Sequence, residues 1–251
     1  ATVVIYGLQA ADGVTIKSDA LTALTLTNVA TTGNNVAITN NTAGHALTVT
    51  QGGNASYATV SLGAFTTTVT DAAATSVTVT DDGTDSYGTL ALATVKATTL
   101  TVNNAGRAVI NVAGDTELTT LTLKGAGATT IANVSGLTKV TSIDASASSG
   151  SVTTSIAPTT TSGVAQKFTG GSGAATLTVN SNAITWGDGV LLTGGSGSND
   201  VLIANYVAGT TKVGETDIAL GSGTASVKGF EYLGLGATAS SATAAYDASG
   251  F

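Results

Sequence analysis

The sequence predicts an all-β protein, built as an irregular β-solenoid or β-roll. Apolar residues and threonine alternate in many short segments, which is the pattern of strands with one buried face. Turn-forming residues separate these segments at intervals of roughly 10–13 residues, close to the spacing of β-sandwiches, barrels and solenoids. No stretch carries the apolar stripe of an amphipathic helix.

The predicted strands share a strict alternation in which every second residue is apolar. Threonine is common at the other positions, where its branched β-carbon favours extended backbone and its hydroxyl group favours contact with water. We therefore expect the apolar residues to face a core and the threonines to face solvent. The segments are residues 24–27, 36–39, 47–50, 77–80, 90–93, 100–103, 121–124 and 177–180.

Two leucine-rich segments bear on the architecture. "LTALTLTNV" at 21–29 and "LTTLTLKGA" at 118–126 both begin Leu-x-x-Leu-x-Leu, as leucine-rich repeats do. However, Asn28 falls one position early for that repeat, and Gly125 replaces it in the second segment. Stacked coils of a β-solenoid explain these leucines better. A β-sandwich-like N-terminal part, over the first ~160 residues, stays an alternative, because strand spacing does not separate the two architectures.

Composition divides the chain into three regions. Residues 1–145 form a threonine-rich all-β region. Residues 146–163 are rich in Ser, Thr and Gly, contain the only proline, Pro158, and are predicted to be linker-like. Residues 164–251 are glycine-rich and predicted to be β-roll-like, continuing into a next repeat.

The charge of the chain excludes several classes of protein. Only 9% of residues are charged, against about 25% in an average globular protein. The net charge is −7 and Arg107 is the only arginine, so we expect no nucleic-acid partner. No apolar run reaches the ~20 residues of a transmembrane segment. The chain lacks cysteine and starts at Ala1 without a signal peptide, so we expect no disulfides and a processed chain or a fragment.

Two glycine clusters share the core Gly-Gly-Ser-Gly. They are "GGSGAATLT" at 170–178 and "GGSGSNDVL" at 194–202. The repeat Gly-Gly-x-Gly-x-Asp-x-Leu-x forms a parallel β-roll whose turns bind Ca²⁺. Ala175 stands at the aspartate position of the first cluster, whereas an inserted serine places Asn199 there in the second, followed by Asp200. The first cluster is therefore predicted to be only a turn.

The second cluster is the better candidate for a metal site. Asn199 and Asp200 offer side-chain oxygens, and the backbone around Gly195 and Gly197 offers carbonyl oxygens. Because Ca²⁺ takes six to eight oxygen ligands, this segment predicts one weak calcium site.

An acidic turn offers a second candidate calcium site. Asp81, Asp82 and Asp85 lie together in "DDGTD" and could surround Ca²⁺ with oxygens. An Asp-Gly turn between two strands predicts the same residues without any metal, so both interpretations stand at this point.

The remaining polar and aromatic candidates favour structural roles. His45 is the only histidine, and we expect a surface or hydrogen-bonded side chain there. Trp186 is expected in the core and Asp188 in a turn, and nothing in the sequence pairs Asp144 or Glu231. A glycosidase or lyase needs paired carboxylates or a base beside an acid, and one arginine with three glutamates leaves few such groups. We therefore predict that the protein is not an enzyme.

Three short segments, together with the glycine clusters, carry a family resemblance. "VSGLTKVTSIDASAS" at 134–148, "VKGFEYLGLG" at 227–236 and "YDASGF" at 246–251 resemble recurring units of calcium-dependent, repeats-in-toxin-like surface-layer proteins. Gram-negative bacteria export such proteins in one step. The resemblance implies a structural, self-assembling component of the extracellular bacterial cell surface, with calcium as ligand. Its expected partners are other copies of itself and cell-surface polysaccharide. The alternative is an adhesin or autotransporter-like passenger that binds a surface ligand.

Overall fold

The computed structural model describes most of the chain. The described residues are 1–8, 13–27, 34–39, 44–52, 65–81, 83, 88–156, 166–180, 190–206 and 226–237.

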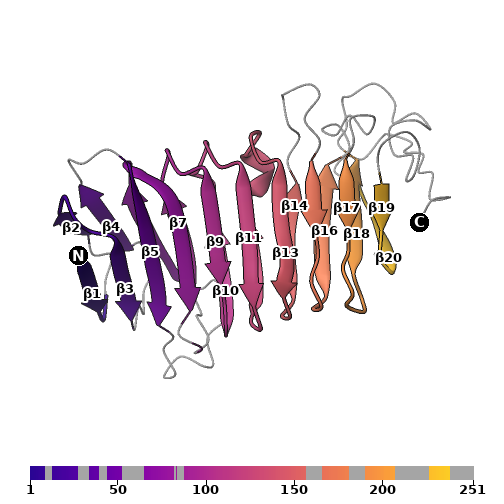
Figure 1. Cartoon of the computed structure of the whole chain (residues 1–251), viewed down its shortest axis with the longest axis horizontal. Coiled ribbons are helices and arrows are strands. Elements are labelled where there is room, and N and C mark those ends of the chain that lie inside the picture. The colour runs from indigo at the N-terminus through magenta and orange to yellow at the C-terminus, as the bar shows by residue number, and fades with distance from the viewer. Residues whose placement is uncertain are drawn as a thin grey trace.

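The described chain winds into a β-solenoid with two long parallel sheets. Each coil contributes one strand to a first sheet, made of the odd-numbered strands, and one to a second sheet, made of the even-numbered strands (Figure 1). The first sheet contains β1 (Thr2–Tyr6), β3 (Ala23–Thr27), β5 (His45–Gly52), β7 (Ala74–Asp81), β9 (Thr99–Asn103), β11 (Thr120–Gly125), β13 (Ser142–Ser148), β15 (Lys167–Thr169), β17 (Leu191–Thr193) and β19 (Ser226–Lys228).

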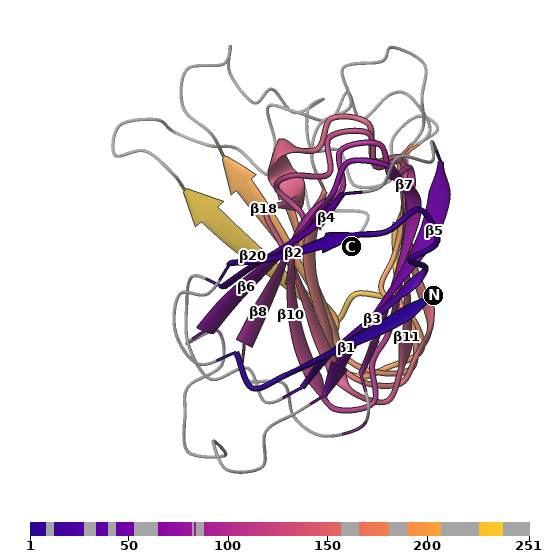
Figure 2. The same ribbon diagram turned by 90° about the vertical axis from the view of Figure 1, so that its left-hand side faces the viewer.

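The second sheet has the same number of strands and lies across the core from the first, as the end-on view shows (Figure 2). Its strands are β2 (Gly13–Lys17), β4 (Asn34–Thr39), β6 (Phe65–Asp71), β8 (Gly88–Ala93), β10 (Arg107–Asn111), β12 (Ala128–Ala132), β14 (Val152–Ile156), β16 (Ala175–Asn180), β18 (Val201–Tyr206) and β20 (Tyr232–Ala237).

The all-β prediction and the solenoid prediction are both confirmed. Each segment predicted from the alternation lies within a strand. The strands pair in parallel from β1 onward, for example Val4 with Thr25. Because an antiparallel sandwich would not pair in this way, the sandwich-like alternative for the N-terminal part is excluded. A short 3₁₀ helix, η2 (Val134–Gly136), is the single helical element of the described residues.

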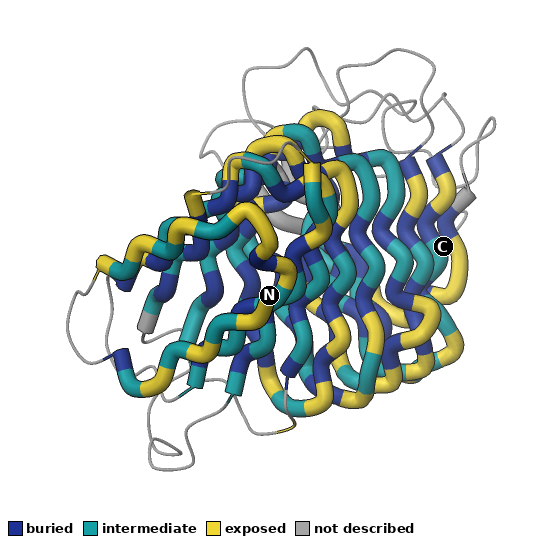
Figure 3. Tube along the Cα trace, turned by 60° about the vertical axis from the view of Figure 1, so that its left-hand side comes forward, coloured by how far each residue is buried: buried dark blue, intermediate teal, exposed yellow. Residues whose placement is uncertain are grey.

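The core lies between the two sheets and is mostly aliphatic, with Phe168 and Phe230 stacked on each other. In β9, Leu100 and Val102 are buried while Thr99 and Asn103 are exposed, and other strands alternate in the same way (Figure 3). Buried residues stack on buried residues in the next coil, as Leu121 does on Leu100. Threonine therefore occupies the outer face because the pleat gives every second side chain to solvent.

Two corners join the sheets, and they differ in length. We call the turns from odd to even strands the glycine corner; between β9 and β14 they are short, for example residues 126–127 between β11 and β12. The turns from even to odd strands form the opposite corner, which spans residues 112–119 between β10 and β11. The glycine corner follows the lower edge of Figure 1 and the opposite corner the upper edge.

The solenoid runs through part of the stretch that was predicted to be linker-like. Within residues 146–163, β14 pairs with β12 on one side and β16 on the other. Residues 146–156 thus form part of a coil of the solenoid, and Pro158 lies outside the described residues. In the described part of the chain, no helix is long and apolar enough to cross a membrane.

Candidate functional site

The glycine corner holds the coils together through main-chain hydrogen bonds. One coil after another donates a backbone N–H to a carbonyl oxygen of the coil before it. The donor–acceptor pairs are Gly127 to Asn104 at 2.9 Å, Ser149 to Gly125 at 2.9 Å, Ser172 to Ser148 at 3.0 Å and Ser196 to Gly171 at 2.9 Å. These four carbonyl oxygens are thus engaged by neighbouring coils.

Glycine is required at this corner because the main chains approach too closely for a side chain. A Cβ atom added at Gly170 would collide with the carbonyl oxygen of Gly194 in the next coil. A Cβ atom at Gly195 would collide with the carbonyl oxygen of Gly171, and Gly195 also has a φ of +127°. Both Gly-Gly-Ser-Gly clusters are therefore explained by the stacking of one coil on the next.

Asp200 of the second cluster contacts the first cluster at Ala175, where the repeat has aspartate. The Asp200 side chain is fully buried, and its Oδ1 atom accepts a hydrogen bond of 2.6 Å from the backbone N–H of Ala175. The two residues lie one coil apart. One carboxylate thus satisfies the turn of the preceding coil, where Ala175 is itself buried.

The structure describes all four residues predicted as ligands around the second cluster. Asn199 is exposed and has a φ of 72°, and its Oδ1 atom accepts a hydrogen bond from the Tyr232 hydroxyl at 3.4 Å. The Asp200 side chain is buried. Gly195 and Gly197 stack against glycines of the preceding coil. Because Ca²⁺ takes six to eight oxygen ligands, the calcium site at this segment stays a prediction.

A second acidic residue lies beside Asp200. The Oε2 atom of Glu231 accepts a hydrogen bond of 2.7 Å from the Asp200 backbone N–H. Burial raises the pKa of the Asp200 carboxyl above its usual value, and the negative charge of Glu231 raises it further, although the Ala175 N–H opposes the shift. The second carboxyl oxygen, Oδ2, is buried and has no hydrogen-bond partner among the residues that the structure describes.

The acidic turn is described only in part. Asp81 is buried at the end of β7, and its Oδ1 atom accepts a hydrogen bond of 2.8 Å from the backbone N–H of Gly83. Asp82 and Asp85 lie outside the described residues, so the calcium site suggested for the three remains a prediction. Among the residues that the structure describes, no three His, Cys, Asp or Glu side chains group closely enough to hold a metal ion.

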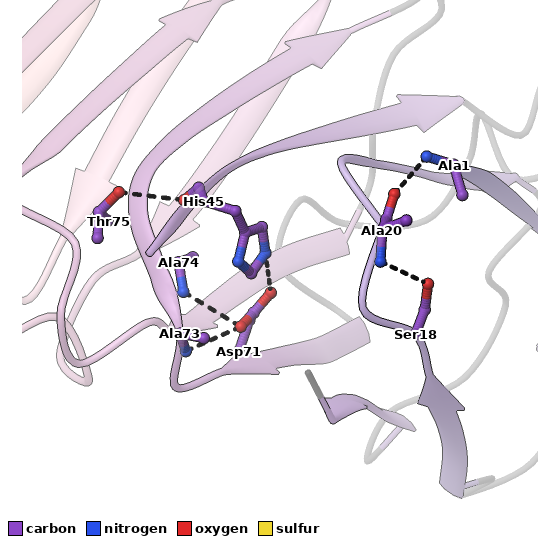
Figure 4. A network of polar contacts seen from close by, with 8 residues as sticks. All are labelled: Ala1, Ser18, Ala20, His45, Asp71, Ala73, Ala74 and Thr75. Carbon is purple, nitrogen blue, oxygen red and sulfur yellow. Dashed lines mark hydrogen bonds and ion pairs between the residues drawn. The ribbon is translucent and has the colours of Figure 1, made fainter. Parts of the chain in front are cut away.

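Sequence reasoning missed a histidine–aspartate pair at the opposite corner. His45 Nε2 lies 2.9 Å from Asp71 Oδ2, and the Asp71 side chain is fully buried (Figure 4). The Oδ1 atom of Asp71 accepts hydrogen bonds from the backbone N–H groups of Ala73 at 3.0 Å and Ala74 at 3.2 Å. Asp71 therefore caps the turn into β7 and fixes the His45 ring beside it.

Asp115 was also missed, and it joins two coils. Its Oδ1 atom accepts hydrogen bonds of 2.7 Å from both the backbone N–H and the hydroxyl group of Thr94. Burial raises the pKa of the Asp115 carboxyl, and the two Thr94 hydrogen bonds oppose that shift. Gln166 acts similarly, since its side-chain amide donates to the Val140 carbonyl at 3.2 Å.

These contacts share a spacing that a sequence could reveal. Asp115 and Thr94 are separated by 21 residues, Asn104 and Ala128 by 24, and Asp200 and Ala175 by 25. Each separation equals the length of one coil. In a sequence, a polar residue in one turn that lies one coil length from another turn would therefore indicate such a contact.

Of the other candidates from the sequence, Asp144 lies within the described residues. Asp144 lies on the outer face of β13, where hydrogen bonds from Ser146 lower the pKa of its carboxyl. Trp186 and Asp188 lie outside the described residues, as does the segment 246–251.

Comparison with known proteins found no match to a family model, to a curated protein or to a solved structure.

Proposed function

We propose that this chain is a structural, non-catalytic component of an exported bacterial surface layer at the extracellular cell surface. The observation that carries the proposal is a rod of parallel coils whose stabilising contacts are repeated from coil to coil and whose outer faces carry few charges. Chains of this kind present long β-rich sides to neighbouring copies, and charged edge residues, a common obstacle to such association, are scarce.

The acidic residues support the non-catalytic part of the proposal. Asp71 is held by His45, Asp115 binds Thr94, and Glu117 pairs with Lys139 at 2.5 Å on the surface. Each of these groups stabilises a turn or bridges neighbouring coils, a structural role that accounts for its position.

Electron microscopy of the longest available form of the protein, with and without calcium, tests the assembly. Ordered two-dimensional arrays are expected. A protein that stays monomeric at high concentration with calcium present would contradict the surface-layer proposal and favour the adhesin or autotransporter-like passenger, which binds a surface ligand as a rod.

The proposed role of calcium can be tested through the thermal stability of the protein. We expect millimolar Ca²⁺ to raise the melting temperature of the protein, because a ligand that binds only the folded state stabilises it. A melting curve that chelator leaves unchanged would remove calcium from the proposal and leave the glycine clusters their stacking role alone.

A further inference from the structure

The outer face of the first sheet carries threonines in register from coil to coil. Thr48, Thr78, Thr101 and Thr122 are direct neighbours on β5, β7, β9 and β11, and together they form a central row along the solenoid. All four are partly exposed, because each is flanked by its neighbours in the row.

Two flanking rows widen this pattern into a grid. On one side, Thr25, Thr50 and Thr80 are neighbours on β3, β5 and β7. On the other side, Ser76, Thr99 and Thr120 are neighbours on β7, β9 and β11. We call these three rows the threonine grid. The strands that bear it lie side by side in Figure 1.

The grid has two regular repeats set by the backbone. Neighbouring strands lie about 4.7–4.9 Å apart, and alternate residues along one strand are about 6.6 Å apart. A threonine side chain is branched at its β-carbon and therefore has restricted rotamers, so its hydroxyl and methyl groups repeat with the backbone. The face thus presents a fixed two-dimensional pattern of hydroxyl and methyl groups.

No ionisable side chain interrupts the grid. The outward positions of β3, β5, β7 and β9 are occupied by Thr, Ser, Ala, Gly and Asn, and the first charged residue of these rows is Lys124 at the end of β11. A charged ligand would meet no opposite charge here, so a neutral surface complements the face best.

The outer face of the second sheet carries a more interrupted pattern. Its corresponding row runs through Thr89, Val109, Thr130, Thr153 and Thr176, so Val109 breaks the line of hydroxyl groups after Thr89 and only three threonines follow in register. The row beside it contains Ala91, Asn111 and Ala132 instead of threonine. The two faces share one backbone repeat but differ in chemistry, which provides an internal control.

From this arrangement we propose that the threonine grid binds ice. Hexagonal ice repeats its oxygen positions on its prism faces in two perpendicular directions, as the grid repeats its hydroxyl groups. Regular hydroxyl groups can each replace a water of the lattice, and the methyl groups between them fill its hollows. The side chains are already restricted before binding, so little conformational entropy is lost on contact.

Other occupants fit the grid less well. Protein interface cores are enriched in aromatic residues, methionine and arginine, and the grid contains none of these. A crystalline polysaccharide is usually bound on aromatic rings, yet on the described part of this face Tyr6 is the exposed aromatic residue, and it lies on the edge strand β1. This inference goes beyond the structural role proposed above and does not depend on it.

The test measures ice growth with the full 251-residue chain. Thermal hysteresis and inhibition of ice recrystallisation are recorded for the wild type, for Thr101→Tyr in the central row and for Thr153→Tyr on the second sheet. We expect the wild type and Thr153→Tyr to shape and arrest ice crystals, and Thr101→Tyr to lose most of that activity. Circular dichroism melting of each variant establishes that it is folded.

A second variant keeps the proposal testable if Thr101→Tyr does not fold. Thr78→Val keeps the shape and strand preference of the residue and removes only its hydroxyl group, so a partial loss of thermal hysteresis is expected. Absence of activity in the wild type overturns the proposal. So does activity that Thr101→Tyr and Thr78→Val fully retain, or retention of the chain on chitin or cellulose without any effect on ice.

Discussion

At the glycine corner neighbouring coils touch through main-chain atoms, whereas at the opposite corner longer turns are anchored by buried polar side chains. Gly170 lies against the Gly194 carbonyl in the first case, and Asp115 reaches Thr94 in the second. In the first case the main chains lie too close together for a side chain at Gly170, whereas in the second a buried carboxylate fixes a longer turn. Substitutions at the two corners should therefore destabilise the fold by different mechanisms.

The largest effect is expected from a methyl group at the glycine corner. Gly170→Ala places a Cβ atom against a backbone carbonyl that cannot move aside without separating two coils. We expect a loss of about 3 kcal/mol or more in the free energy of unfolding, at the upper end of overpacking costs. Gly136→Ala is the matched control, because nothing lies near its added Cβ, and it should change stability by less than about 0.5 kcal/mol. Equal melting temperatures for both variants would contradict the role of the glycines.

The next effect is expected from the anchor of the opposite corner. Asp115→Ala leaves the buried backbone N–H of Thr94 without its acceptor, which should cost about 1–3 kcal/mol. Asp115→Asn keeps an acceptor oxygen toward Thr94 and should lose clearly less. Urea denaturation of both variants measures the difference, and a loss as large for asparagine as for alanine would show that the charge matters more than the hydrogen bonds.

A smaller, pH-dependent effect is expected at Asp200. The pKa of this carboxyl is raised in the folded state above 3.8, so the folded state binds its proton more tightly than the unfolded state does. Its contribution to stability is therefore greatest below pH 3.8 and is lost as the pH rises through the folded pKa. Asp200→Asn removes this dependence and keeps an acceptor for Ala175, so at pH 7 it should be at least as stable as the wild type. Unfolding measured between pH 4 and pH 7 compares the two, and parallel curves would contradict the prediction.

The smallest effect is expected on the surface of the opposite corner. Lys139 and Glu117 are both about half exposed, so solvent and salt screen their ion pair. Lys139→Ala should change the free energy of unfolding by less than about 1 kcal/mol, and added salt should reduce even that difference. A loss as large as that of Asp115→Ala would mean that the exposed pair anchors this corner after all.

The strands could be predicted from the sequence because their signal is local. Alternation in segments such as 77–80 and 121–124 reports one buried face, whatever the partner strand is. Parallel or antiparallel pairing changes nothing in that alternation, which is why a sandwich stayed open for the N-terminal part. The order of the strands depends on contacts between coils that lie more than 20 residues apart.

The candidate site was harder to predict for the same reason. The first Gly-Gly-Ser-Gly cluster was predicted to be a turn, but the atom that excludes a side chain at Gly170 belongs to Gly194 in the next coil. The hydrogen bond from Ala175 to Asp200 also joins two coils, so the local sequence around Asp200 does not indicate it. These contacts can be predicted from the sequence only when the number of residues per coil is known.

The parallel hydrogen bonding between coils also makes the rod mechanically anisotropic. Backbone hydrogen bonds between strands point along the stack, whereas the strands themselves run across it. A pull along the stack loads the bonds of one coil at a time, so the rod should peel open from its ends at low force. A pull along the strand direction loads all the bonds between two coils together in shear, as between β5 and β7, and should meet much greater resistance.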